Sequence, residues 1–152
     1  MNTPLDTLLE QAVRQRDDAL AALLRAEEAA SRLRLQAEQL QTYRGEYQDR
    51  GPTRAGSTAA VELLHCHSRF MQRLDQALGQ QTGHLQAAQA RVVQLRGALL
   101  AHETRVAAVR KLLERRAQEQ RLAAARIEQR RSDEAAVQRH WRLRADTLPA
   151  TH

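Results

Sequence analysis

The chain has 152 residues, a formal net charge of +6 and only 3% aromatic residues. Its length suffices for one ordinary domain, but the six glycines, the three prolines and an apolar content made mostly of alanine and leucine indicate long helices rather than a globular core. The single cysteine excludes an internal disulfide, and no apolar run approaches the roughly 20 residues of a membrane span. The N-terminus lacks the basic start and apolar core of a signal peptide, so we expect a cytoplasmic protein.

A first helix is predicted over about residues 4–49. Thr3 is suited to the N-cap and Pro4 to the first helical position, while Asp6 favours the positive end of the helix dipole. Apolar residues then recur at alternating spacings of four and three, which is the heptad pattern of a helix that packs along a partner helix. Eleven of thirteen positions in this first seam are apolar or aromatic: Leu5, Leu9, Ala12, Arg16, Ala19, Leu23, Ala26, Ala30, Leu33, Ala37, Leu40, Arg44 and Tyr47.

A loop is predicted over about residues 50–57, where Gly51 can end the first helix and Pro52 prevents its continuation. Ser57 or Thr58 can cap a second helix, expected over about residues 58–146 and followed by a short disordered tail. Twelve of fifteen positions in its seam are apolar: Leu64, His67, Met71, Leu74, Leu78, Gln81, Leu85, Ala88, Val92, Leu95, Leu99, His102, Val106, Val109 and Leu113.

The fold class that follows is all-α: a long antiparallel two-helix coiled-coil hairpin whose second helix is much longer than the first, forming a single domain over residues 1–152. A tight turn centred near residue 53 would place residue i opposite roughly residue 106 − i. Leu40 would then face the region of residue 66, and Gln36 that of residue 70. Everything after about Glu103 would lack a partner within the chain.

The excess positive charge is concentrated in that unpartnered segment. Residues 1–102 have a balance of +1, whereas residues 103–152 hold twelve basic and seven acidic residues. The segment could form a solvated face of ion pairs, for example between Glu128 and Arg131, or it could dock onto an acidic protein surface. Nucleic acid is a third partner for such a basic helix, disfavoured here because acidic residues are interspersed throughout.

No motif indicates catalysis or a cofactor. His65, Cys66 and His67 are consecutive, and consecutive helical side chains point about 100° apart, so they cannot converge on one metal ion. A two-helix rod also has no enclosed pocket from which water is excluded. We therefore expect neither an enzyme nor a cofactor, and no small-molecule substrate.

The aromatic residues form the most informative pattern. Tyr43 and Tyr47 lie four residues apart on one helical stripe just before the loop, and Phe70 lies just after it. One interpretation is that these rings widen the hydrophobic core near the closed end of the hairpin. The other is that they form an exposed patch of the kind that anchors protein interfaces.

At these residues the chain resembles the family of the flagellar export protein FliJ, a component of bacterial flagellar type III secretion. The segments "LQTYRGEYQDR", "FMQRLDQALGQQ" and "ARIEQRRSDEAAVQR" carry the resemblance, and the start "LDTLLEQAVRQRDDALAAL" also fits. The resemblance implies a long antiparallel coiled coil similar to the central stalk of rotary ATP synthases. It further implies three partners, which are the ring of the export ATPase, the cytoplasmic domain of the export gate, and export chaperones.

The resemblance also implies where these partners bind. The expected gate-binding face consists of Gln36, Leu40, Tyr43, Tyr47, Phe70, Leu74, Ala77 and Gln81, although Gln81 stands where a ring-bearing residue is expected. The joined terminal end is expected to enter the ATPase ring, with the basic segment supplying Arg110, Arg115, Arg116, Arg121, Arg126, Arg130 and Arg131. The protein would lie at the cytoplasmic face of the inner membrane only when bound to the export apparatus.

Other interpretations remain at this stage. The equivalent stalk of a virulence secretion system belongs to the same mechanical class, but the tyrosine block favours the flagellar assignment. A basic coiled-coil protein that binds nucleic acid belongs to a different class, as does a generic homodimeric coiled coil.

Overall fold

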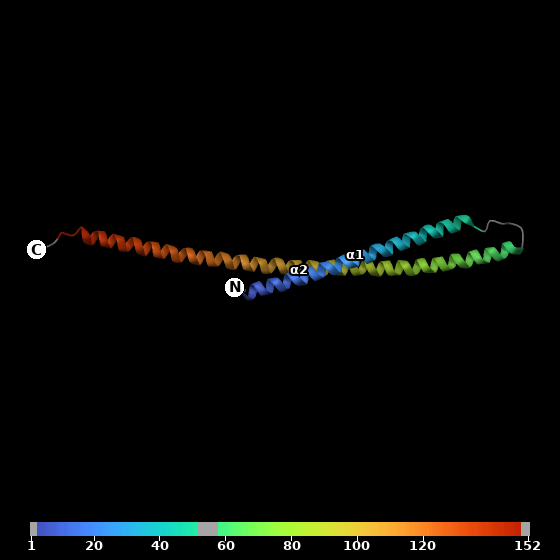
Figure 1. The fold of residues 1–152 in the computed structure, drawn as a ribbon, viewed down its shortest axis with the longest axis horizontal. Coiled ribbons are helices and arrows are strands. Elements are labelled where there is room, and N and C mark those ends of the chain that lie inside the picture. The colour runs from blue at the N-terminus through green and yellow to red at the C-terminus, as the bar shows by residue number, and fades with distance from the viewer. Residues whose placement is uncertain (1–2, 52–57, 150–152) are drawn as a thin grey trace. The chain divides into compact units, whose positions relative to one another are not determined.

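The computed structural model describes residues 3–51 and 58–149. Two helices account for nearly all of these residues: α1 spans Pro4–Arg50 and α2 spans Thr58–Asp146. The helices run in opposite directions, as Figure 1 shows, and α2 has 89 residues against 47 in α1. The predicted all-α hairpin with a much longer second helix is therefore confirmed.

The ends of α1 are set by residues that the sequence singles out. The Thr3 hydroxyl and backbone N–H both donate to the Asp6 carboxylate, at 2.7 and 3.0 Å, and the Asp6 N–H donates back to the hydroxyl at 3.3 Å. This reciprocal arrangement satisfies backbone donors that the first helical turn leaves unpaired. At the other end Gly51 adopts a φ of 48°, the left-handed conformation that terminates helices and favours glycine. Pro52 and the alternative cap Ser57 lie outside the described residues.

Contacts within the chain divide it into two units. We call Gln11–Arg105 the hairpin unit, because it contains most of α1 together with the first half of α2, and we call Met1–Glu10 with Val106–His152 the terminal unit. The single domain expected over residues 1–152 stays a prediction. Neither helix, as far as the structure describes it, has a stretch long and apolar enough to cross a bilayer.

The core of the hairpin unit is a narrow seam between the helices. Leu23, Ala30 and Val92 form its buried centre, and alanines and leucines of both helices pack against them. Every predicted position of the first seam is buried or half-buried, including Arg16 and Arg44, whose long stems cover apolar surface. The alternation of large and small residues lets the helices approach closely, because the alanine positions accept leucine and valine side chains from the facing helix.

The axial register of the two helices differs from the predicted one. Gln36 lies opposite Gln81, with 2.9 Å between the amide nitrogen of Gln81 and the side-chain oxygen of Gln36, rather than opposite residue 70. Glu27 likewise reaches Arg96. The facing residues are therefore displaced by roughly three helical turns or more along α2. The assumption of a tight turn near residue 53 was wrong, and a seam that repeats every seven residues cannot by itself reveal such a shift.

The start of α2 shows the consequence of that shift. Val61, Leu63 and Leu64 are each at least half exposed, so Leu64 does not belong to the buried seam as predicted. The seam begins instead at His67, which is half-buried.

In the terminal unit, burial continues beyond the predicted limit of pairing. Val106 and Val109 are 2% and 4% exposed, and Leu113 is half-buried. The unpartnered part of α2 therefore begins after Leu113 rather than after Glu103. Residues 114–149, which we call the overhang, are exposed at every position except Ala135.

Candidate interaction surfaces

An aromatic cluster joins the two helices in the hairpin unit. The ring of Tyr47 lies 4.3 Å from that of Phe70 and is stacked on His67 at 4.9 Å with an interplanar angle of 11°. Tyr43 meets Phe70 edge-on at 6.2 Å and lies 6.4 Å from Tyr47. The stacked pair of Tyr47 with His67 and the T-shaped pair of Tyr43 with Phe70 have geometries that aromatic rings favour, and the other two pairs are tilted. Both interpretations of the tyrosines therefore hold in part: some rings of the cluster widen the core between the helices, and others are exposed at the surface.

Exposure separates the members of this cluster. Tyr47, Phe70 and His67 are half-buried between the helices, whereas Tyr43 is 48% exposed. Tyr43 is therefore accessible to a partner while Phe70 packs against its ring. Sequence reasoning missed His67 as a member, although its position on the second seam was the signal that could have revealed it.

The remaining predicted gate-binding residues continue along the same pair of helices. Leu74 is buried at 8% exposure, Leu40 and Ala77 are half-buried, and Gln36 is exposed. The amide of Gln81 donates to the backbone carbonyl of Leu33 at 3.3 Å as well as to Gln36. The structure thus brings all eight residues to one stretch of the hairpin, but only Tyr43 and Gln36 among them are exposed.

An ion pair flanks the aromatic cluster. The Nε of Arg44 donates to the Asp75 carboxylate, and its Nη1 donates to Gln48 at 3.2 Å. The hydrogen bond to Asp75, together with the carboxylate charge, raises the pKa of Arg44 above its usual value. Arg44 interrupts the apolar seam because its charge has this partner on the facing helix.

The residues that could bind a metal do not converge. Among the described residues, no three histidine, cysteine, aspartate or glutamate side chains are grouped as ligands. Cys66 is exposed and forms no disulfide, and the ring of His67 is stacked on that of Tyr47.

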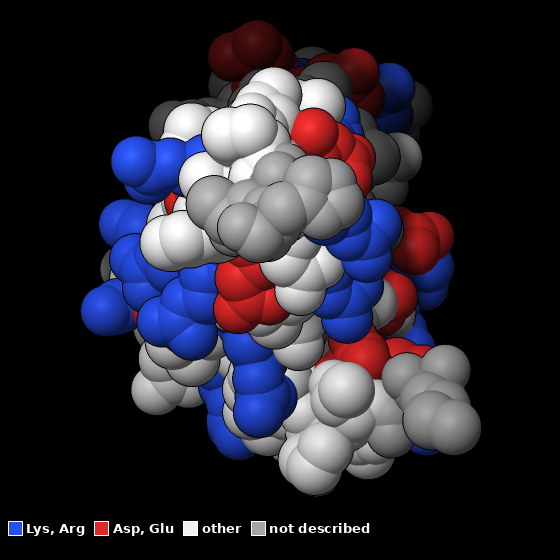
Figure 2. Space-filling model, turned by 90° about the vertical axis from the view of Figure 1, so that its left-hand side faces the viewer, with Lys and Arg blue, Asp and Glu red and all other residues white. Residues whose placement is uncertain are grey.

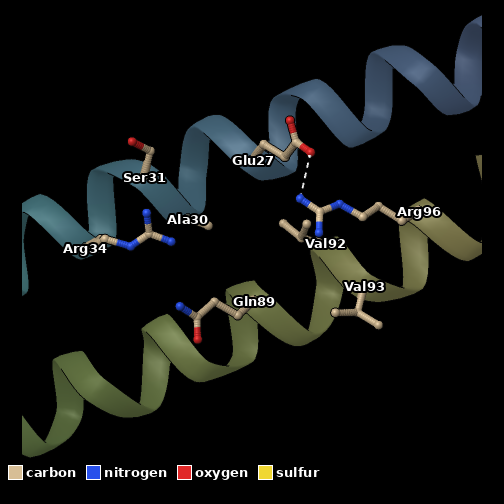
Figure 3. Close-up of a pocket in the computed structure, with 8 residues that line it drawn as sticks. All are labelled: Glu27, Ala30, Ser31, Arg34, Gln89, Val92, Val93 and Arg96. Carbon is tan, nitrogen blue, oxygen red and sulfur yellow. Dashed lines mark hydrogen bonds and ion pairs between the residues drawn. The ribbon is translucent and has the colours of Figure 1, made fainter.

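A shallow groove lies between the helices at the centre of the hairpin unit (Figure 3). Its lining consists of Glu27, Ala30, Ser31, Arg34, Gln89, Val92, Val93 and Arg96. Ala30 and Val92 form the buried floor, and Glu27 spans the groove to Arg96 with 3.3 Å between oxygen and nitrogen. The one carboxylate of the lining is thus already paired with a base, and Ser31 donates to no histidine or carboxylate in the described chain. Such a groove provides complementarity for a partner rather than reactive groups.

The overhang carries six of the seven arginines expected to meet the ATPase, and Arg110 lies just before it. All seven predicted arginines, from Arg110 to Arg131, are exposed. Figure 2 looks toward the left-hand end of Figure 1 and shows Lys and Arg side chains on several sides, with Asp and Glu between them.

Few of these charges pair within the chain. In the described part of the overhang a single ion pair forms, between Arg115 and Glu119 at 3.4 Å, and the anticipated pair of Glu128 with Arg131 is not among the ion pairs of the described residues. Gln129 instead donates to Asp133 at 3.2 Å. The arginines are therefore available to an acidic partner surface.

The fold and these surfaces define a class of protein: an all-α coiled-coil hairpin whose described features are helix faces suited to macromolecular partners. The sequence model of the flagellar FliJ protein matches residues 1–145, and the chain belongs to this family. Membership makes it a component of flagellar type III export that associates with the flagellar export apparatus. A search among curated proteins gives no match to the chain.

Proposed function

We propose that this protein is a non-enzymatic stalk and adaptor that links the ring of the export ATPase to the cytoplasmic domain of the export gate and assists export chaperones. It acts in the cytoplasm and lies at the inner membrane only while bound to the export apparatus. The observation that carries the proposal is the difference between the two units. The hairpin unit presents a half-exposed tyrosine ring within an aromatic cluster, whereas the terminal unit contains the exposed basic overhang.

The gate is assigned to the aromatic cluster. Tyr43 has the properties of an interface anchor, since it is large, nearly half exposed and held in orientation by Phe70. The position of Tyr43 and the spacing of the helices are fixed by three less exposed residues, Tyr47, Phe70 and Leu74. Gln36 adds an exposed amide whose oxygen already accepts a hydrogen bond from Gln81.

The ATPase is assigned to the overhang. A long helix that is exposed on all sides gains no packing free energy from its own chain, so a partner that covers it would stabilise it substantially. Arginine suits such a contact because its planar guanidinium binds carboxylates through two parallel hydrogen bonds.

A pair of substitutions tests the gate assignment. Tyr43→Ala should weaken binding to the gate domain by about tenfold or more, as expected for an aromatic anchor, while thermal unfolding stays nearly unchanged. Leu24→Ala is a matched control, because Leu24 is 56% exposed on the same helix but remote in sequence from the cluster. Equal losses for both variants in a calorimetric titration would contradict the assignment.

Charge reversal tests the ATPase assignment. Arg121→Glu combined with Arg126→Glu should abolish stimulation of the export ATPase and leave gate binding intact. Arg91→Glu, an exposed arginine in the hairpin unit, serves as the control and should have little effect. Loss of gate binding together with ATPase stimulation would show that the two surfaces are not separate.

A further inference from the structure

The heptad seam does not end where packing within the chain ends. Counting on from Leu113 by threes and fours to the end of α2, the core-type positions of the overhang are Arg116, Gln120, Ala123, Ile127, Arg130, Glu134, Val137, Trp141 and Arg144. The large apolar side chains among them are unusually open for such positions: Ile127 and Val137 are each 53% exposed, and Trp141 is 62% exposed. A seam of this kind packs against another helix when one is available.

The central six of these positions, from Ala123 to Trp141, are complementary to themselves in size and charge when a second copy runs antiparallel. In an antiparallel coiled coil, each a position of one helix faces a d position of the partner helix. With the two-fold axis near residue 132, Ile127 meets the partner's Val137, and the small Ala123 meets the partner's large Trp141. At the centre, Arg130 meets the partner's Glu134. Each contact occurs twice, because a two-fold interface uses the same patch of both copies.

No neighbouring arrangement matches charges and sizes in this way. A shift of one heptad places Ile127 against Arg130 in one direction and against Arg144 in the other. A parallel pair sets Arg130 against its own copy and Glu134 against its own copy, which repel. The sequence of the overhang therefore specifies one orientation and one register.

We propose that the overhang is a self-association surface, on which a second copy of this chain pairs antiparallel about residue 132 when no other partner covers it. The dimer is weak, because Arg131 and Asp133 at the flanking positions each lie beside their own copy. The proposal goes beyond the role in export given above, since it concerns the chain alone. If the overhang also enters the ATPase ring, the two associations compete for the same seam.

The only tryptophan of the chain provides a direct readout. With the full-length protein alone, sedimentation equilibrium should show a reversible dimer, and Trp141 emission should shift to shorter wavelength as concentration rises, because pairing buries the indole. A chain that stays monomeric up to about 100 μM, with Trp141 emission unchanged, overturns the proposal. If Trp141 emission shifts only when the ATPase is added, the ATPase ring alone covers the seam of the overhang. That result also overturns the proposal.

Exchanging the charges of Arg130 and Glu134 tests whether the partner is a second copy of the chain and whether it runs antiparallel. Arg130→Glu and Glu134→Arg should each weaken the dimer by about tenfold or more, since each converts two attractions into two repulsions. The double variant should recover dimerisation, and the two single variants should associate with each other when mixed. Arg139→Glu, whose position points away from the seam, is the control and should dimerise normally.

Folding does not complicate this experiment, because all three positions are exposed and their helicity can be checked by circular dichroism. Failure of the double variant to recover, or equal weakening by Arg139→Glu, refutes antiparallel pairing at this seam. Neither result bears on gate binding by Tyr43 or on ATPase stimulation through Arg121 and Arg126, so the two proposals fail independently.

Discussion

Tyr47 contacts three other rings in the described part of the chain, those of Tyr43, Phe70 and His67. In a coiled coil built mostly from alanine and leucine, this cluster is the feature that is not repeated every seven residues. It therefore distinguishes one axial register of the helices from those displaced by whole heptads. The same rings that hold Tyr43 toward a partner also align α1 with α2.

At the residue scale, the N-cap of α1 predicts a pH dependence. Hydrogen bonds from the Thr3 hydroxyl and then from the Thr3 backbone N–H hold the pKa of Asp6 below its ordinary value of 3.8. Because the folded pKa is the lower one, the stabilisation is fully present above about 3.8 and is lost as the pH falls through the folded pKa.

Titration of the Asp6 carboxyl by NMR should therefore give a midpoint below 3.8, with the first turn of α1 fraying at still lower pH. Thr3→Ala is the matched control, since it removes the hydroxyl and should return the midpoint toward 3.8. A wild-type midpoint at or above that value would contradict the capping geometry.

At the scale of the element, α2 continues through glycines that favour flexibility. A Cβ atom added at Gly79, Gly83 or Gly97 would meet no atom within 4 Å, so neither close packing nor a special backbone conformation requires glycine there. The helix stays intact because its apolar seam packs on α1 on both sides of these positions.

Alanine at these positions should stabilise the helix. Gly83→Ala is expected to increase the free energy of unfolding by about 0.5–1 kcal/mol, because it restricts the unfolded chain without creating a clash. Gly51→Ala should have the opposite effect, since its φ of 48° is costly for any residue with a Cβ. Denaturant unfolding followed by circular dichroism measures both, and a destabilised Gly83→Ala variant would reveal a function for flexibility at that point.

At the scale of the whole molecule, the hairpin unit and the overhang should differ in local stability. Helical backbone in the hairpin unit is supported by a buried seam, whereas residues 114–146 include no buried residue and depend mainly on their own helical hydrogen bonds. Hydrogen exchange at a dilution that keeps the chain monomeric should show protection in the overhang lower by about tenfold or more. Equal hydrogen-exchange protection in the hairpin unit and the overhang would mean that intrinsic helix propensity alone keeps the overhang helical.

The sequence by itself determined the helical class, the caps of α1 and most of the residues that face the seam, because capping and heptad spacing are local properties of the chain. Leu23, Ala30 and Val92 were identifiable as core in this way. The axial register was decided only in the tertiary structure, since every shift by seven residues leaves the same leucines and alanines on the seam. For that reason the structure differs from the predicted register at several residues. Leu64 is exposed, Val106 and Val109 are buried, and Gln36 is hydrogen-bonded to Gln81. The division of the aromatic cluster into a packed Tyr47 and an accessible Tyr43 has the same cause, because exposure at the edge of a seam depends on which residues of the facing helix lie beside it.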